Sequence, residues 1–149
     1  MMAQFLVSMV GVWGFAVLFH APRRFYGACA LCGAVAWVVY LIVTTEYQAG
    51  PAVAALSAST ALAILSAVLS IQLKAPSTMF LLPGIFPLVP GAGIYYSAYY
   101  MIQGDLALAA SKGVETLLVA GGIALGLMIG AAFSNVAMRV IGLGRKRQG

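Results

Sequence analysis

Charge is scarce in this sequence. Of its 149 residues, 7% are Asp, Glu, Lys or Arg, and only three are acidic. Soluble domains contain about 25% charged and about 45–50% apolar residues. With 63% hydrophobic residues, this chain has too few polar side chains to cover a core in water. The scarcity of charge excludes a soluble globular domain and predicts a single domain in the lipid bilayer.

Histidine and cysteine, which hold metals and carry out redox chemistry, are also rare. The single histidine is His20, and the two cysteines, Cys29 and Cys32, form a CxxC pair inside an apolar run. Redox and zinc motifs need solvent access and further ligands, so we expect these cysteines to be inert packing residues. The apolar runs also lack a nucleophile–base pair and a carboxylate dyad. These absences predict no metal, no cofactor and no enzyme.

Long apolar runs are abundant. A helix needs about 20 mostly apolar residues to cross the hydrocarbon core, and none of the runs alternates with a period of two. The first run lacks a basic leader and a small-x-small cleavage site, so we expect a retained span rather than a signal peptide. The sequence predicts an all-α, polytopic membrane bundle of about five spans, at residues 2–19, 27–44, 51–71, 80–102 and 115–141.

The basic residues predict the orientation of these spans. They lie in short gaps and in the C-terminal tail, and they form no basic face interleaved with aromatics, so nucleic-acid binding is not expected. Lys and Arg favour the cytoplasmic side. This predicts a bacterial inner-membrane protein with its N-terminus outside and its C-terminus in the cytoplasm. Seven of the eight basic residues then face the cytoplasm: Arg23, Arg24, Lys74, Arg139, Arg145, Lys146 and Arg147.

The fourth run contains residues that interrupt helices. Proline lacks an N–H and clashes with the carbonyl four residues earlier, and glycine removes side-chain support. Irregular backbone at membrane depth is tolerated only inside protein or beside a watery cavity. The run is therefore predicted to break and line a transport path, the alternative being a kinked packing helix. The residues concerned are Pro83, Gly84, Pro87, Pro90, Gly91 and Gly93.

A broken helix would also place a new helix N-terminus in the membrane. Its free N–H groups, expected near residues 91–93, can bind a carboxylate. Lys74 either draws anions from the cytoplasm or anchors the chain as a positive-inside residue. Tyr95 either lines the path or joins an interfacial belt with the tyrosines that follow, which pair at spacings of four: Tyr95, Tyr96, Tyr99 and Tyr100.

Small residues recur every fourth position in the fifth run. Gly122, Gly126 and Gly130 would let another helix approach closely, and residues 55, 59, 63 and 67 do the same in the third run. The stripe either packs within the bundle or faces a second chain, and Asn135 could hydrogen-bond across either contact.

The three acidic residues fall near the predicted outer ends of the spans. They are Glu46, Asp105 and Glu115. A transporter coupled to protons usually has a carboxylate or histidine within the membrane. This chain is therefore not expected to hold a complete proton relay, and a partner would supply any titrating group.

Several of these segments together resemble the threonine/serine exporter family. The resemblance rests on Lys74-Ala-Pro76, on Leu82-Pro-Gly-Ile-Phe-Pro-Leu-Val-Pro-Gly91 and on Tyr95, and the short chain is similar to the YjjB-type half. The loop Phe19–Arg24 is also similar, although His20 stands where an asparagine is expected, so no role is transferred to it.

The resemblance implies a two-component exporter completed by a YjjP-type membrane subunit. Implied substrates are threonine and serine for fused members, and succinate or similar dicarboxylates for split members. The alternative from another functional class is a membrane scaffold that stabilises a partner protein without transport.

Overall fold

The regular structure of this protein is helical throughout the part described. The computed structural model describes residues 2–146, with side chains described up to residue 134. This confirms the predicted all-α fold class. The elements are α1 (Met2–Leu18), η1 (Arg23–Phe25), α2 (Tyr26–Thr45), α3 (Pro51–Leu73), α4 (Thr78–Ile85), η2 (Phe86–Leu88), α5 (Gly91–Ile102) and α6 (Leu106–Lys146).

Most of these helices are suited to a membrane. By length and composition, α2, α3 and α6 can each cross a bilayer, and the bent pair of α4–η2 with α5 is a fourth candidate. Helix α1 is apolar but has 17 residues, at the lower end of the about 17–25 that a span needs. The chain is thus a polytopic helical bundle, as predicted.

The last helix begins earlier than predicted, at Leu106 instead of Glu115. The Asp105 side chain accepts a hydrogen bond from the Leu108 N–H at 3.0 Å, which caps the first turn. Gly104, at φ 81°, makes the tight turn from α5. Residues expected in a loop, including Lys112, therefore lie on the helix.

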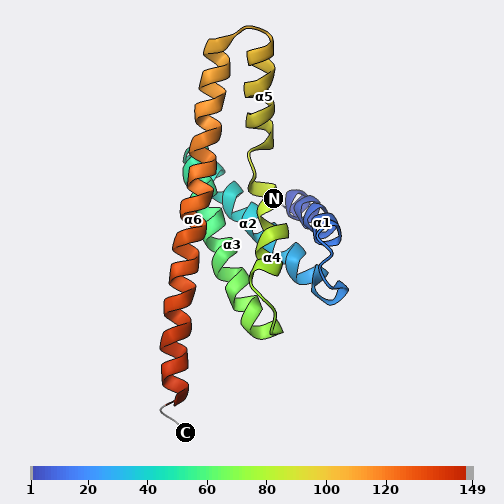
Figure 1. Ribbon diagram of the computed structural model, residues 1–149, viewed down its shortest axis with the longest axis vertical. Coiled ribbons are helices and arrows are strands. Elements are labelled where there is room, and N and C mark those ends of the chain that lie inside the picture. Colours follow the sequence, from blue (N-terminus) through green and yellow to red (C-terminus); the bar gives the residue numbers. More distant parts are fainter. Residues whose placement is uncertain (1, 147–149) are drawn as a thin grey trace.

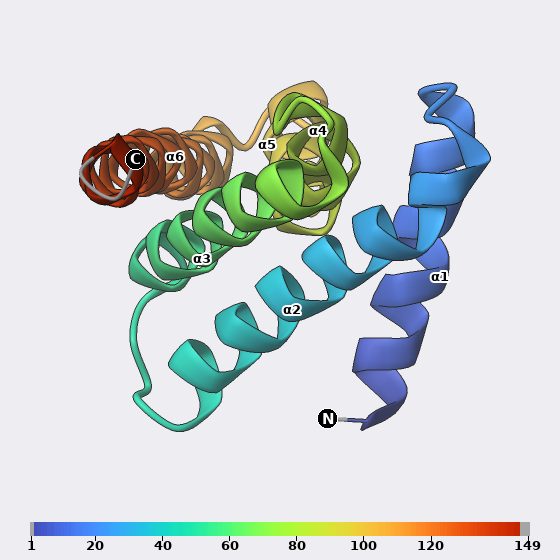
Figure 2. The same cartoon turned by 90° about the horizontal axis from the view of Figure 1, so that it is seen from below.

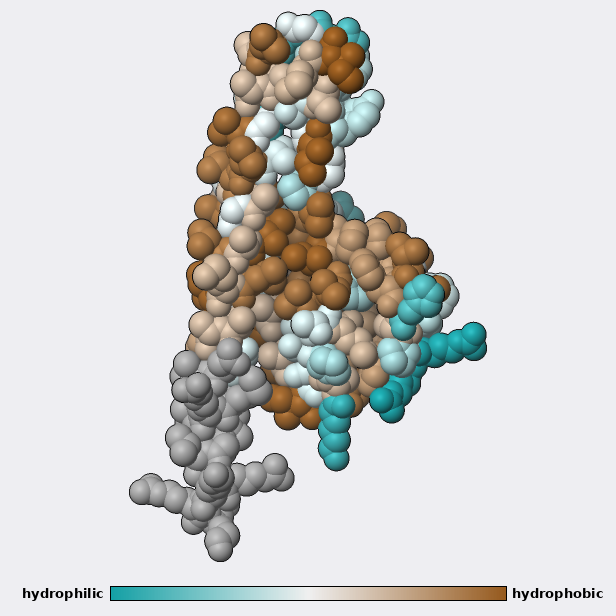
Figure 3. Space-filling view, viewed as in Figure 1, coloured by the Kyte–Doolittle hydropathy of each residue, from teal (hydrophilic) through white to brown (hydrophobic). Residues whose placement is uncertain are grey.

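Helix α6 runs the length of the molecule, with α5 alongside its upper part and α3 beside its middle (Figure 1). In the view along α6, helices α1, α2 and α3 run across the picture, so all three are inclined to α6 (Figure 2). The loops after α1 and α3 lie on the lower side of the bundle, and α6 continues below them before it ends (Figure 1). Apolar surface fills the middle of the view, and hydrophilic side chains gather at the lower edge and at the tip of the α5–α6 hairpin (Figure 3).

The glycine stripe of α6 packs against α3 of the same chain. A side chain at Gly122 would overlap the Ala52 carbonyl oxygen, and one at Gly126 would overlap the Leu56 carbonyl oxygen and the Ser59 hydroxyl. The Thr60 hydroxyl donates a hydrogen bond across the contact to the Gly126 carbonyl at 3.1 Å. Of the two interpretations offered by the sequence, this stripe therefore serves packing within the bundle. Gly130 continues it, and the Asn135 side chain lies outside the described residues.

The remaining core lies where α1, α2, α3 and α4 meet. Cys29, Cys32, Leu62 and Phe80 are fully buried there. The Cys29 thiol lies 3.4 Å from the Met79 carbonyl oxygen, to which it donates. Proline at position 83 removes the N–H that would have bonded that carbonyl within α4. Cys29 therefore does more than fill space, because it satisfies a carbonyl that the helix cannot.

The α3–α6 contact leads to a stability prediction. Replacing Gly126 by Ala should lower the free energy of unfolding by about 1–3 kcal/mol, because the added methyl group meets backbone that cannot move aside. Gly121 is the matched control, since it is exposed on the same helix and a Cβ there meets nothing within 4 Å. Gly121→Ala should leave stability unchanged or slightly raised. Unfolding in detergent measures both, and equal effects would contradict this packing.

The thiol–carbonyl contact predicts an order of stabilities. Cys29→Ser keeps a donor for the Met79 carbonyl, whereas Cys29→Ala leaves that carbonyl unpaired and should be less stable by about 1 kcal/mol. At Cys32, which is buried without a described hydrogen bond, the serine variant should be the less stable one. The same order at both positions would show that the Cys29 contact is not a hydrogen bond.

Candidate functional site

The break in the fourth span lies at Val89 and Pro90. Helix α4 continues through Pro83, and a 3-10 turn carries the chain through Pro87 to Leu88. Pro90 has φ −78° and ψ 57°, and the Gly91 N–H donates to the Val89 carbonyl at 2.8 Å. These values describe an inverse γ-turn. The two halves of the span are bent by 47° at this point, so the predicted break is present. Pro83 lies inside α4, Pro87 lies in the 3-10 turn that follows it, and Pro90 lies at the break itself.

Helix α5 begins at the break without a cap. No side chain caps this end, and the first hydrogen bond back to the turn runs from the Ile94 N–H to the Pro90 carbonyl at 3.1 Å. Because the γ-turn occupies the Gly91 N–H, the Ala92 and Gly93 N–H groups are those left without a described protein acceptor. The positive end of the helix dipole adds to their attraction for an anion.

The residues that carry these amides, Ala92 and Gly93, line a cavity of about 370 Å³. The volume lies within the range of about 300–1,000 Å³ that is usual for small-molecule sites. Its walls come from α2, the start of α3, the break, α5 and α6. The lining residues are Trp37, Tyr40, Pro51, Pro87, Leu88, Val89, Pro90, Gly91, Ala92, Gly93, Tyr96, Lys112, Glu115, Thr116 and Val119.

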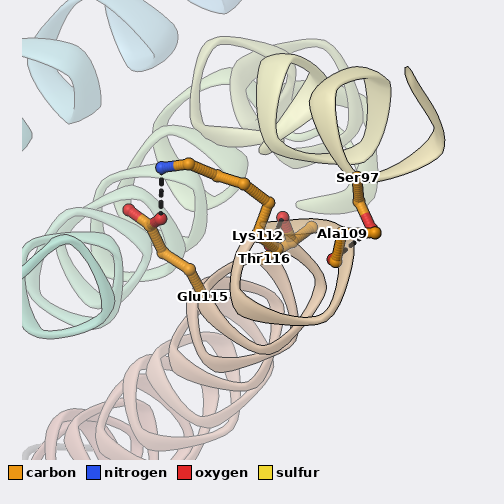
Figure 4. A network of polar contacts seen from close by, with 5 residues as sticks. All are labelled: Ser97, Ala109, Lys112, Glu115 and Thr116. Carbon is orange, nitrogen blue, oxygen red and sulfur yellow. Dashed lines mark hydrogen bonds and ion pairs between the residues drawn. The ribbon is translucent and has the colours of Figure 1, made fainter. Parts of the chain in front are cut away.

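An ion pair on α6 forms part of the cavity wall. Lys112 Nζ lies 2.8 Å from Glu115 Oε2, and the two side chains are 43% and 50% exposed (Figure 4). An exposed pair at this spacing on one helix contributes little to stability. Glu115 was predicted near the outer end of the fifth span, and the structure places it on the wall of the cavity that adjoins the break.

Small residues hold α5 close to α6 beside this cavity. A side chain at Gly93 would overlap the Thr116 hydroxyl, and one at Gly113 would lie 3.2 Å from the Ser97 hydroxyl oxygen. Ser97 donates to the Ala109 carbonyl at 3.0 Å (Figure 4). Gly93 therefore has a packing role in addition to its place on the cavity wall. Gly91 differs, because a side chain there would meet no atom within 4 Å.

Other residues predicted for the pathway lie elsewhere. Gly84 is buried, and a side chain there would lie 2.7 Å from a Leu62 methyl carbon. Pro83 lines a separate cavity of about 220 Å³ beside His20. Lys74 ends α3 in a left-handed conformation, and α4 separates it along the chain from the break. The structure brings Pro87, Pro90, Gly91 and Gly93 together and leaves Pro83, Gly84 and Lys74 apart.

The tyrosines of α5 form two stacked pairs. Tyr95 stacks on Tyr99 with ring centroids 6.2 Å apart, and Tyr96 stacks on Tyr100 at 6.4 Å, as their spacing predicts. Tyr96 lines the cavity, whereas Tyr95 does not and is 62% exposed. Of the two roles offered by the sequence, lining a path therefore fits Tyr96, whereas a place in an interfacial belt fits the exposed Tyr95.

Sequence reasoning missed a group of residues on the cavity wall. Trp37 and Tyr40 of α2 stack with ring centroids 5.3 Å apart, and both line the cavity with Lys112 and Glu115. The spacing of three between Lys112 and Glu115 is a visible signal for an ion pair on a helix. Nothing local in the sequence indicates that the pair faces the break.

The described residues contain no group of three His, Cys, Asp or Glu side chains that could hold a metal ion. Searches of the curated proteins and of the solved structures return no match. A protein-family model described as "Threonine/Serine exporter, ThrE" matches residues 4–133, which cover most of the chain, including every residue that lines the cavity. The family predicted from the proline–glycine segment is thereby confirmed, and the chain belongs to the threonine/serine exporter family.

Proposed function

We propose that this chain is the membrane subunit of a two-component exporter, and that its solute binds in the cavity at the helix break. The observation that carries the proposal is the uncapped start of α5, which opens onto a cavity of about 370 Å³ beside an ion pair. Membership of an exporter family supports transport as the activity. A kinked packing helix would need neither the free amides nor the space in front of them.

The free amides favour a solute with a carboxylate. Helix N-termini bind anions through unpaired N–H groups and the dipole, and broken helices in transporters use the same arrangement. The carboxylate would be held by the Ala92 and Gly93 N–H groups, without a buried arginine. These neutral donors hold a carboxylate less strongly than a buried arginine would, which favours release of the solute.

Two solute classes fit this description: the amino acids threonine and serine, and small organic acids such as the dicarboxylate succinate. The family description supports the amino acids. A dicarboxylate has a driving force of its own, since each negative charge that leaves a negative-inside cell releases about 2.3 kcal/mol per 100 mV. Both classes share the carboxylate that the α5 amides would bind.

The partner we propose is a YjjP-type membrane subunit, in the inner membrane of a bacterium. Helix α5 supports a partner, because none of its residues is buried in this chain and it packs mainly on α6. Its apolar side chains and paired tyrosines need lipid or protein around them. An outside N-terminus and a cytoplasmic C-terminus agree with the positions of Arg23 and Arg24 in the η1 turn after α1 and of Lys74 at the end of α3.

Filling the cavity tests the site directly. Gly91→Leu should reduce efflux by about tenfold or more, the change that corresponds to about 1.4 kcal/mol, because the side chain enters the solute's space. Gly91→Ala is the matched control and should retain efflux, since a Cβ there meets nothing within 4 Å. Efflux of labelled threonine and succinate from preloaded cells measures both variants. Full export by Gly91→Leu at normal membrane levels would contradict the site.

Co-expression separates transport from the scaffold alternative. Efflux should require this chain and the YjjP-type chain together, and cells with either chain alone should retain the solute. If the partner alone exports at a rate that follows only its own abundance, this chain is a scaffold. Quantifying both chains in the membrane fraction, with efflux measured in the same cells, distinguishes the two outcomes.

A further inference from the structure

The Lys112–Glu115 pair stands out among the charged groups of the protein because of where it lies. Of the described residues that line the cavity at the break, these two are the ones with charged side chains, and they contribute one charge of each sign. Their contact, 2.8 Å between Lys112 Nζ and Glu115 Oε2, turns both groups toward each other on one helix (Figure 4). The cavity wall is therefore neutral in total but strongly dipolar.

The fold does not need this pair. Both residues are on α6, so the contact ties no helix to another, and a half-exposed pair at this spacing adds little to helix stability. The α5–α6 contact is made by other groups, namely Gly93 against Thr116 and the Ser97–Ala109 hydrogen bond. A charged pair that contributes little to structure and faces a cavity is available for a ligand.

The surroundings of Glu115 suit a cation. Trp37 and Tyr40 stack with an interplanar angle of 10°, and both line the cavity with Glu115 and Tyr96. Ammonium groups bind well between a carboxylate and aromatic rings, which attract cations through their π faces. A second negative charge on the solute would instead be repelled by Glu115.

We propose that Glu115 is a specificity-determining residue, which receives the ammonium group of a zwitterionic solute and disfavours dicarboxylates. Lys112 holds the Glu115 carboxylate in place while the cavity is empty. On binding, the solute's ammonium takes the place of Lys112, and the freed Lys112 pairs with a carboxylate of the solute. The exchange leaves the net charge of the site unchanged. This inference rests on the transport function proposed above and adds the choice of solute to it.

The test compares two solutes in cells that carry both chains of the exporter. Glu115→Gln should lower efflux of labelled threonine by about 10- to 100-fold, the effect of losing one charge-assisted hydrogen bond. Succinate efflux should stay the same or rise, so the ratio of the two rates shifts toward the dicarboxylate. The control is Glu46→Gln, which removes an exposed carboxylate after α2, outside the cavity, and should change neither rate.

A charge exchange separates a ligand role from a structural one. The double variant Lys112→Glu with Glu115→Lys keeps an ion pair on α6 but moves the carboxylate. Threonine efflux should remain low in it, whereas a purely structural pair would restore the wild-type rate and overturn the proposal. An unchanged ratio of rates in Glu115→Gln would overturn it too. If the wild-type pair of chains exports neither solute, the proposed function fails as well, and that result is distinct from an altered preference.

Discussion

The structure depends on how backbone groups between Met79 and Gly93 find partners where lipid offers none. Prolines remove N–H groups from this segment, and hydrocarbon cannot replace the hydrogen bonds that are lost. The Cys29 thiol satisfies the Met79 carbonyl, and the γ-turn at Pro90 joins the Val89 carbonyl to the Gly91 N–H. Two N–H groups at the start of α5 remain without a described acceptor, and their residues, Ala92 and Gly93, line the cavity. The candidate site thus lies where this segment leaves two amides without a described partner.

Close packing elsewhere makes this irregular segment possible. Helices in lipid associate through van der Waals contact and hydrogen bonds, because burying apolar side chains brings no gain there. The glycine stripe of α6 lets α3 approach until backbone meets backbone, with the Thr60 hydroxyl bonded to the Gly126 carbonyl. That contact fixes α6 beside α3 and so positions the wall of the cavity that α6 forms. Gly93 and Gly113 allow a similarly close approach between α5 and α6.

Electrostatics in the cavity comes from dipoles and from one compensated pair of charges. The α5 amides offer partial positive charge without an ionised group, and Lys112 and Glu115 balance each other. A site of this kind costs little to leave exposed to water and can exchange partners readily. Such weak, exchangeable contacts suit a protein that must release its solute as well as bind it.

Composition alone determined the class of this protein, because a chain with so few charges has only lipid as a suitable solvent. The local sequence also determined the position of the break, since proline and glycine act on their own backbone, and the tyrosine pairs, since helical spacing is local. It could not foresee that Pro83 would remain helical, because the donor for Met79 comes from Cys29, fifty residues away.

Only the tertiary structure decided which faces meet. The stripe through Gly126 has the same sequence whether it meets α3 or a second chain, and Glu115 lies on the cavity wall because α6 starts at Leu106 and packs beside the break. The physical reason is that backbone preferences act over a few residues. The juxtaposition of α2, α5 and α6 around one space is instead set by contacts between segments far apart in the chain.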